Sequence, residues 1–187
     1  MPTNQLVETF ADAATAIGAQ VETFSEVDAA LAYVRERANG PVLLPAFPSG
    51  ERQDLATRLR ATGLEVATGD LRPVAATAAA GVTGANFALA ATGSVVLEST
   101  SEAVRLATTL PERHFVLLDP AKVIADDTAA IPLIREFHHR QPRNYLAWIT
   151  GPSRTADIER ILTIGVHGPG ELHILLVPDI SEDPLEM

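Results

Sequence analysis

The sequence predicts an α/β fold built on a mainly parallel β-sheet. Short apolar runs of the length of buried strands alternate with longer segments whose apolar residues repeat at the helical period. The 187 residues are enough for one domain with a sizeable core, and a content of 47% hydrophobic and 20% charged residues is typical of a globular protein. Regular alternation of strand and helix is typical of parallel sheets covered by helices.

The first part of the chain follows this alternation closely. A helix over residues 4–17 opens it, because its apolar residues fall on one face and Gly18 follows as a stop. Ser25 is the expected cap of the next helix. The expected helices cover residues 4–17, 25–40 and 51–60, and the expected strands cover residues 20–24, 42–44 and 64–67.

The pattern changes between residues 70 and 101. The run 73–80 is almost all Ala, Val and Thr, which indicates close packing, and the glycines after it form neither a dinucleotide-binding fingerprint nor a phosphate-binding loop. What remains is the turn Thr92-Gly93-Ser94 before a buried strand at 95–99. Gly93 would let a ligand approach the backbone, and the flanking hydroxyls could donate to it. A plain turn explains the same residues equally well.

The alternation resumes in the second part of the chain. The run 115–118 is a strong strand signal, and residues 179–187 read as an acidic tail that is solvated or draped on the surface. The expected helices cover residues 102–110 and 127–139, and the expected extended segments cover residues 115–118, 122–125, 145–149 and 172–177.

Composition excludes several functions. The chain has no cysteine, so it has no thiolate nucleophile and no cysteine-ligated iron–sulfur cluster. A net charge of −10 argues against a nucleic-acid or anionic-membrane binder. Lys122 is the only lysine, and its sequence neighbours give no support to a Schiff-base role. We find no signal peptide and no long apolar span, and we therefore expect a cytoplasmic protein.

A polar stretch after residue 150 is the main candidate for chemistry. Gly151-Pro152 ends a strand, and Ser153 or Thr155 could then cap a helix with Asp157 and Glu159 in its first turns. The amides of that helix start, with Ser153, Arg154 and Thr155, would form an anion site. The alternative is that Ser153 is only a cap and Arg154 lies on the surface.

The histidines offer one candidate for proton transfer. His167 lies in a glycine-rich loop, Gly165 to Gly170, where a neutral imidazole could act as an acid or base near pH 7. The spacing of the histidines predicts no metal site. A hydrolase triad with Ser94 or Ser153 can be written down, but the chain has no Gly-x-Ser-x-Gly elbow, and we do not favour it.

Three segments together resemble a known family. The run 81–90 with Thr92-Gly93-Ser94, the run 151–159 and the run 165–169 are similar to the LUD domain of the lactate utilisation protein C (LutC) family, from about residue 40 onward. The resemblance implies a three-layer sandwich akin to ribose-phosphate isomerase, CoA-transferase and formyltetrahydrofolate cyclo-ligase. It also implies a role in the oxidation of L-lactate to pyruvate, with iron–sulfur clusters on partner subunits.

The chain departs from the family pattern at one turn. The family commonly has a glutamate before Thr-Gly-Thr, whereas this chain has Ala91 at that position and Ser94 in place of the second threonine. Any chemistry carried by that glutamate is absent here. Glu98, on the following strand, is not equivalent to that family glutamate.

These observations lead to one main expectation about function. We expect a component of an iron–sulfur-dependent lactate oxidation system that has no redox centre of its own and binds a small anionic ligand. The ligand site would comprise Thr92, Gly93, Ser94, Ser153, Arg154, Thr155 and Gly168, with His167 as the catalytic candidate. A stand-alone enzyme of acyl, folate or sugar-phosphate chemistry, and a scaffold subunit, are the alternatives.

The same observations suggest how the chain is organised. The expected units are an N-terminal helical segment (1–40) packed on the domain, a LUD-type α/β domain (41–178) and the acidic tail (179–187).

Overall fold

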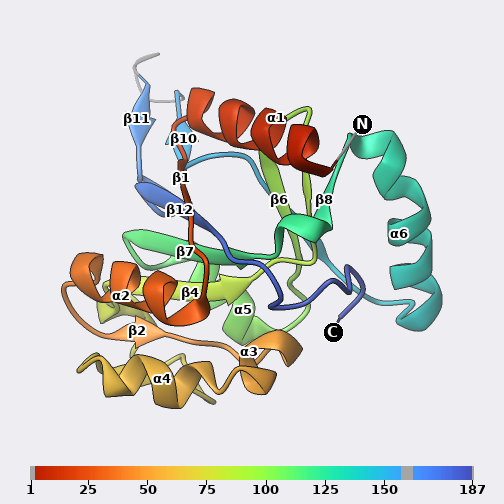
Figure 1. Cartoon of the computed structure of the whole chain (residues 1–187). Coiled ribbons are helices and arrows are strands. Elements are labelled where there is room, and N and C mark those ends of the chain that lie inside the picture. Colours follow the sequence, from red (N-terminus) through yellow and green to blue (C-terminus); the bar gives the residue numbers. More distant parts are fainter. Residues whose placement is uncertain (1–2, 157–161, 187) are drawn as a thin grey trace.

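A parallel β-sheet forms the centre of the molecule in the computed structural model, which describes residues 3–156 and 162–186 (Figure 1). Its strand order is β1-β12-β7-β4-β2-β3, and every neighbouring pair is parallel. The predicted α/β fold with a mainly parallel central sheet is confirmed. The strands are β1 (Gln20–Thr23), β2 (Val42–Leu43), β3 (Val66–Ala67), β4 (Ala80–Gly84), β7 (Arg113–Leu118) and β12 (Glu171–Leu176).

Helices lie on both faces of this sheet (Figure 1). Helices α2 and α4 cover one face, while α1 and α5 lie on the other. Helix α5 comes very close to β4: a Cβ atom on Gly81 would lie 1.9 Å from the carbonyl oxygen of Ala107. The helices are α1 (Thr3–Ala16), α2 (Val27–Arg37), α3 (Pro48–Arg52), α4 (Leu55–Ala61), α5 (Glu102–Thr109) and α6 (Asp127–Arg140).

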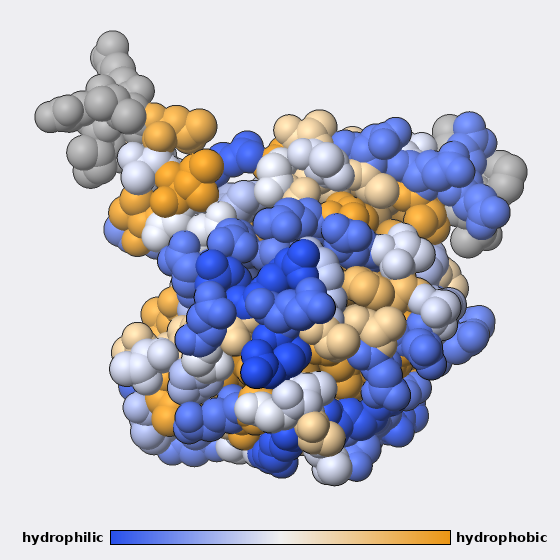
Figure 2. Space-filling model, turned by 60° about the vertical axis from the view of Figure 1, so that its left-hand side comes forward, coloured by the Kyte–Doolittle hydropathy of each residue, from blue (hydrophilic) through white to orange (hydrophobic). Residues whose placement is uncertain are grey.

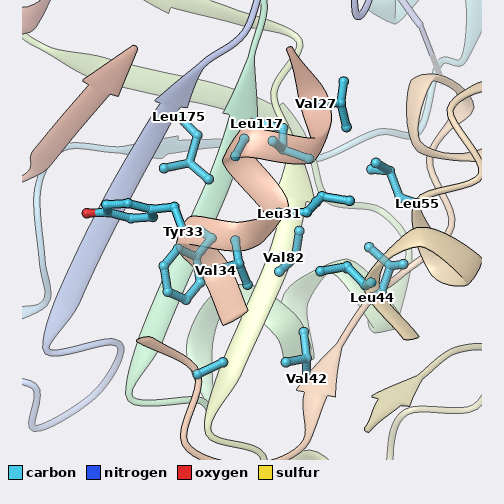
Figure 3. Packing of buried hydrophobic residues seen from close by; sticks show 14 of the residues in the cluster. Val27, Leu31, Tyr33, Val34, Val42, Leu44, Leu55, Val82, Leu117 and Leu175 are labelled. Atoms are coloured by element: carbon cyan, nitrogen blue, oxygen red, sulfur yellow. The ribbon is translucent and has the colours of Figure 1, made fainter. Parts of the chain in front are cut away.

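The largest core cluster lies between α2 and the central sheet. Figure 3 shows Leu31 and Val34 of α2 pointing toward the strands, beside Val82 of β4 and Leu117 of β7. All four side chains are buried. Burial of apolar surface contributes about 25 cal/mol per Å² to folding, and it holds the sheet and its helices as one body.

A second, mixed sheet was not predicted. It lies on the side of the central sheet that faces away from α2. Its order is β8-β5-β6-β9, comprising β5 (Phe87–Leu89), β6 (Ser94–Glu98), β8 (Val123–Ile124) and β9 (Leu146–Ile149). Strand β9 lies where the apolar run 145–149 predicts a strand. It was expected to be buried, but as an edge strand it is partly exposed.

Two predicted helices differ in the structure. The helix expected over 51–60 is interrupted between α3 and α4, where Asp54 adopts a left-handed conformation with φ of 48°. The helix expected to begin after a cap at Ser153 or Thr155 does not begin there, because β10 (Arg154–Thr155) pairs antiparallel with β11 (Thr163–Ile164). The expected first-turn acids, Asp157 and Glu159, lie outside the described residues.

The first 40 residues contribute to the central sheet. Strand β1 pairs with β12 along four residue pairs, and α2 covers the core beside it. The division of the chain at residues 40 and 178 stays a prediction. None of the helices within residues 3–156 and 162–186 combines the length and the apolar character that a membrane-spanning segment needs.

The segment after β12 is not the solvated tail that its composition suggests. Ile180 and Ser181 are 6% and 8% exposed, and the Glu186 side chain is 8% exposed. Residues 178–186 form no helix or strand, and they run along the protein surface at the edge of the sheet where β12 and β7 both have their carboxyl ends (Figure 1). Of the two predicted alternatives, the segment is draped on the surface: Glu182 and Asp183 are exposed, whereas Glu186 binds buried partners, among them Lys122.

Candidate functional site

The turn Thr92-Gly93-Ser94 lies against α1 and the end of β9. The Ser94 hydroxyl is 2.8 Å from the Thr150 hydroxyl and 2.7 Å from that of Thr92. A Cβ atom on Gly93 would lie 2.3 Å from the backbone nitrogen of Ala14. Because Gly93 has no side chain, α1 can pack directly against the backbone of this turn.

Arg154 also makes a contact with α1. Its guanidinium donates a hydrogen bond to the carbonyl oxygen of Ile17, at the end of the helix. Thr155, beside it on β10, pairs with Thr163 of β11. The structure thus does not bring these two residues together with the other predicted residues around one hollow.

Three predicted residues do meet. Ser153, His167 and Gly168 line a hollow of about 290 Å³, together with Trp148 of β9 and His114 of β7. Over the face of the molecule that Figure 2 presents, hydrophobic and hydrophilic side chains are interspersed. The backbone N–H of Ser153 donates to the carbonyl of Pro169 over 2.9 Å, which holds the two loops together. His167 is exposed, so it can reach a molecule in this hollow.

His114 is the buried polar group of this region. It is 1% exposed, its Nε2 lies 2.8 Å from the Thr83 hydroxyl, and its Nδ1 has no hydrogen-bond partner among the described residues. Burial, with a smaller contribution from the charge of His173, lowers the pKa of His114 to about 3. The imidazole is therefore neutral near pH 7.

This burial predicts acid sensitivity. Below pH 6.5 the unfolded chain binds a proton at His114 that the folded chain does not bind until the pH approaches its folded pKa of about 3. The stability that depends on the neutral imidazole is complete above pH 6.5. It falls by about 1.4 kcal/mol per pH unit as the pH drops through that interval. Urea unfolding of wild type and His114→Gln between pH 7 and 4 measures this, and equal slopes would contradict it.

A second site lies at the carboxyl ends of three neighbouring parallel strands. In the strand order, β7, β4 and β2 lie side by side. The segments that follow them carry Lys122, Asn86 and Ser49, which are 3%, 5% and 2% exposed. Ligands of open α/β sheets bind in crevices at this edge. Here a crevice of about 170 Å³ is lined by residues that include Phe47, Asn86 and Glu98.

The carboxylate of Glu186 occupies one wall of this strand-end crevice. Its Oε1 accepts hydrogen bonds from Lys122 Nζ over 2.9 Å and from the Ser49 hydroxyl over 2.7 Å. Its Oε2 accepts from Arg52 over 2.9 Å and from the Ser181 hydroxyl over 2.9 Å. Four donors, two of them cationic, thus surround one carboxylate.

The polar groups of the crevice are held in place by further bonds. Lys122 Nζ also donates to the Ala85 carbonyl over 3.2 Å, and the Asp119 carboxylate accepts the N–H of Ala121 over 2.9 Å in the turn that carries Lys122. Asn86 accepts the N–H of Glu98 and donates to the Glu186 carbonyl, both over 2.7 Å. The binding groups are therefore preorganised.

The carboxylate in this site is ionised. Burial alone would raise the pKa of Glu186, but the hydrogen bonds from Ser49 and Lys122 and the charge of Lys122 outweigh it and hold the pKa below its ordinary value. The site therefore stabilises a carboxylate anion. Chemically it can bind and orient an organic acid. In the described ranges, no group of three or more metal-ligating side chains is placed to hold a metal ion.

No sequence motif points to the strand-end crevice. The sequence neighbours of Lys122 indicate no chemistry, and Ser49 belongs to no motif. Asn86 lies in the run 81–90 that carries the family resemblance, but that resemblance assigns it no role. One signal could have found them, because each of the three follows a short apolar run that forms a parallel strand. Glu186 carries no such signal, since its partner Lys122 is 64 residues away.

Comparison with known proteins identifies the family. Residues 7–177 match the LUD domain family. Lactate utilization protein C of Bacillus subtilis is 30% identical over 164 residues, which cover 81% of this chain and 68% of that protein. An uncharacterized protein of Neisseria meningitidis is 38% identical over 109 residues, and lactate utilization protein C of Anoxybacillus flavithermus is 35% identical over 99 residues. These two matches span 57% and 53% of this chain and 46% and 44% of the relatives, so less than half of their length.

A solved structure shares the fold. The crystal structure of a DUF162 family protein from Deinococcus radiodurans superposes with a TM-score of 0.69 at 18% identity, covering 95% of this chain and 99% of that one. At this identity the likeness concerns the fold alone. The family match over most of the chain and the LutC relatives agree with the resemblance carried by the three sequence segments. The chain belongs to the LUD domain family.

Proposed function

We propose that this protein acts in the cytoplasm as a LutC-like component of an iron–sulfur-dependent system that oxidises L-lactate to pyruvate. Several of its relatives carry the name lactate utilization protein C. The chain itself has no cysteine, so the clusters would belong to partner subunits. In this proposal the chain supplies a binding site for a small organic acid.

One observation carries the proposal for the ligand. Buried Lys122 and Ser49 hold an ionised carboxylate in the strand-end crevice. Lactate and pyruvate carry the same group on a short carbon chain. The apolar side chains of Phe47, Leu97 and Val104 line the adjoining crevice and suit a small methyl-bearing molecule. The hollow lined by Ser153, His167 and Gly168 stays a second predicted location.

A titration with matched ligands tests this proposal. Calorimetry of the wild type and of Glu186→Gln with L-lactate, pyruvate and lactamide separates the effect of charge from that of size, because lactamide is a neutral analogue of lactate. We expect the two acids to bind and lactamide not to bind, since burying Lys122 without an anion is costly. Equal binding of lactamide, or no binding of either acid by either protein, would contradict the ligand class.

The partner part of the proposal needs a separate experiment. We expect the chain to co-purify with cluster-bearing subunits from cells grown on lactate, and the isolated chain not to oxidise lactate. Turnover of a small substrate by the isolated chain would instead support the alternative of a stand-alone enzyme.

A further inference from the structure

We propose that residues 182–186 are an internal competitor, in which the Glu186 carboxylate occupies the subsite for the ligand's carboxylate and must leave before the ligand binds. The inference rests on the proposed function, because it concerns the same site. It adds a regulatory property, because a segment of the chain itself competes with the ligand for the strand-end crevice.

The groups that would bind a ligand carboxylate all lie outside residues 182–186. Lys122 follows β7, Ser49 and Arg52 lie on α3, and Asn86 follows β4. Each of these side chains donates to Glu186: three of them to the carboxylate and Asn86 to the backbone carbonyl. A free carboxylate can therefore accept the same three charge-assisted or hydroxyl bonds that Glu186 accepts.

The position of the segment suits a detachable element. It forms no helix or strand, and its Glu186 contacts α3 through the side chains of Ser49 and Arg52. One of its bonds lies within the segment, from the Leu185 N–H to the Asp183 carboxylate over 2.9 Å. A bond of this kind survives when the segment moves as a unit.

A hinge can be placed at Ser181. Ile180 and Ser181 are buried, and the Ser181 N–H donates to the Asp119 carboxylate over 3.2 Å, which anchors this point to the turn after β7. Beyond it, Glu182 and Asp183 are exposed. Leu185 is partly buried and packs against the cluster that contains Phe137 of α6. Displacement would therefore move residues 182–186 and leave the sheet intact.

The exchange of one anion for another explains why the site would stay closed without ligand. The Lys122 side chain is 2% exposed, and an ammonium left without a counterion in such a place is strongly disfavoured. Glu186 supplies that counterion in the resting protein. An incoming carboxylate supplies it in the same way, so ligand binding and release of residues 182–186 are coupled.

The substitution Glu186→Gln tests the competitor. It keeps the size of the side chain and removes its charge, while Glu182→Gln removes an exposed charge from the same segment and serves as the control. Calorimetry with pyruvate is expected to show about 10- to 100-fold tighter binding by Glu186→Gln than by wild type, because a hydrogen-bonded charged competitor has been weakened. Glu182→Gln should bind as wild type does.

A second measurement does not depend on a ligand. Amide hydrogen exchange of residues 182–186 should be faster in Glu186→Gln than in wild type and unchanged in Glu182→Gln. Unchanged exchange in Glu186→Gln overturns the competitor. So does pyruvate binding at the wild-type affinity or below it, although the proposed ligand class then stands. A further outcome is that amide exchange is faster in Glu186→Gln than in wild type while neither the wild type nor Glu186→Gln binds L-lactate or pyruvate. In that case the proposed ligand class fails and the detachable segment stands.

Discussion

Replacing Lys122 by methionine in the Glu186→Gln background is expected to weaken pyruvate binding by about 100-fold, because a buried charged donor is lost from the centre of the site. The Glu186→Gln background removes the internal competitor, so the measured change reports the ligand's own contact. It also avoids leaving the Glu186 carboxylate buried beside a methionine. Isothermal titration calorimetry measures the effect.

Arg52 provides the matched control for Lys122. Both side chains donate to the Glu186 carboxylate over 2.9 Å, but the Arg52 side chain is 55% exposed while that of Lys122 is 2% exposed. An exposed ion pair contributes on the order of 0–1 kcal/mol, so Arg52→Met should change the affinity by about fivefold at most. Equal losses in the two variants would show that Lys122 is not the centre of the site. Circular dichroism would verify that both are folded.

Replacing Gly93 by alanine is expected to destabilise the protein by about 3 kcal/mol or more. The residue has φ of +66°, and the added Cβ would lie 2.3 Å from the backbone nitrogen of Ala14, so α1 must shift. A left-handed conformation costs about 1–2 kcal/mol for alanine, and forcing packed elements apart costs about 1–3 kcal/mol more. Urea unfolding measures the loss.

Gly69→Ala separates the two contributions. Gly69 has a similar φ of +76°, but no atom lies within 4 Å of the position that an added Cβ would take, so only the backbone cost applies there. We expect Gly93→Ala to be at least about 1 kcal/mol less stable than Gly69→Ala. Equal stabilities would mean that α1 does not press on Gly93, and would return Gly93 to consideration as a point of ligand approach.

Many of the elements could be predicted from the sequence, because helix and strand periods are local, but β4 and β5 were not predicted as strands. The strand 172–177 and the helix 127–139 follow from their own residues, and both are present as β12 and α6. Local signals do not report which strands are neighbours. Strand β12 lies between β1 and β7, and this pairing depends on contacts between distant parts of the chain.

The same limit explains the outcome for the candidate site. The capping signal at Ser153 is local and weak, and the pairing of Arg154 with Ile164 on β11 overrides it. The loop with His167 was found because glycines mark it in the sequence. The strand-end crevice needs Lys122, Ser49 and Glu186 together, and only the topology of the sheet brings these distant residues to one edge.

The position of a bound carboxylate tests the account most directly. A crystal structure of Glu186→Gln grown with pyruvate is expected to place the pyruvate carboxylate within about 3 Å of Lys122 Nζ and the Ser49 hydroxyl, with residues 182–186 displaced. Pyruvate bound in the hollow lined by Trp148 and His167, with Gln in place of Glu186 still seated against Lys122, would contradict it.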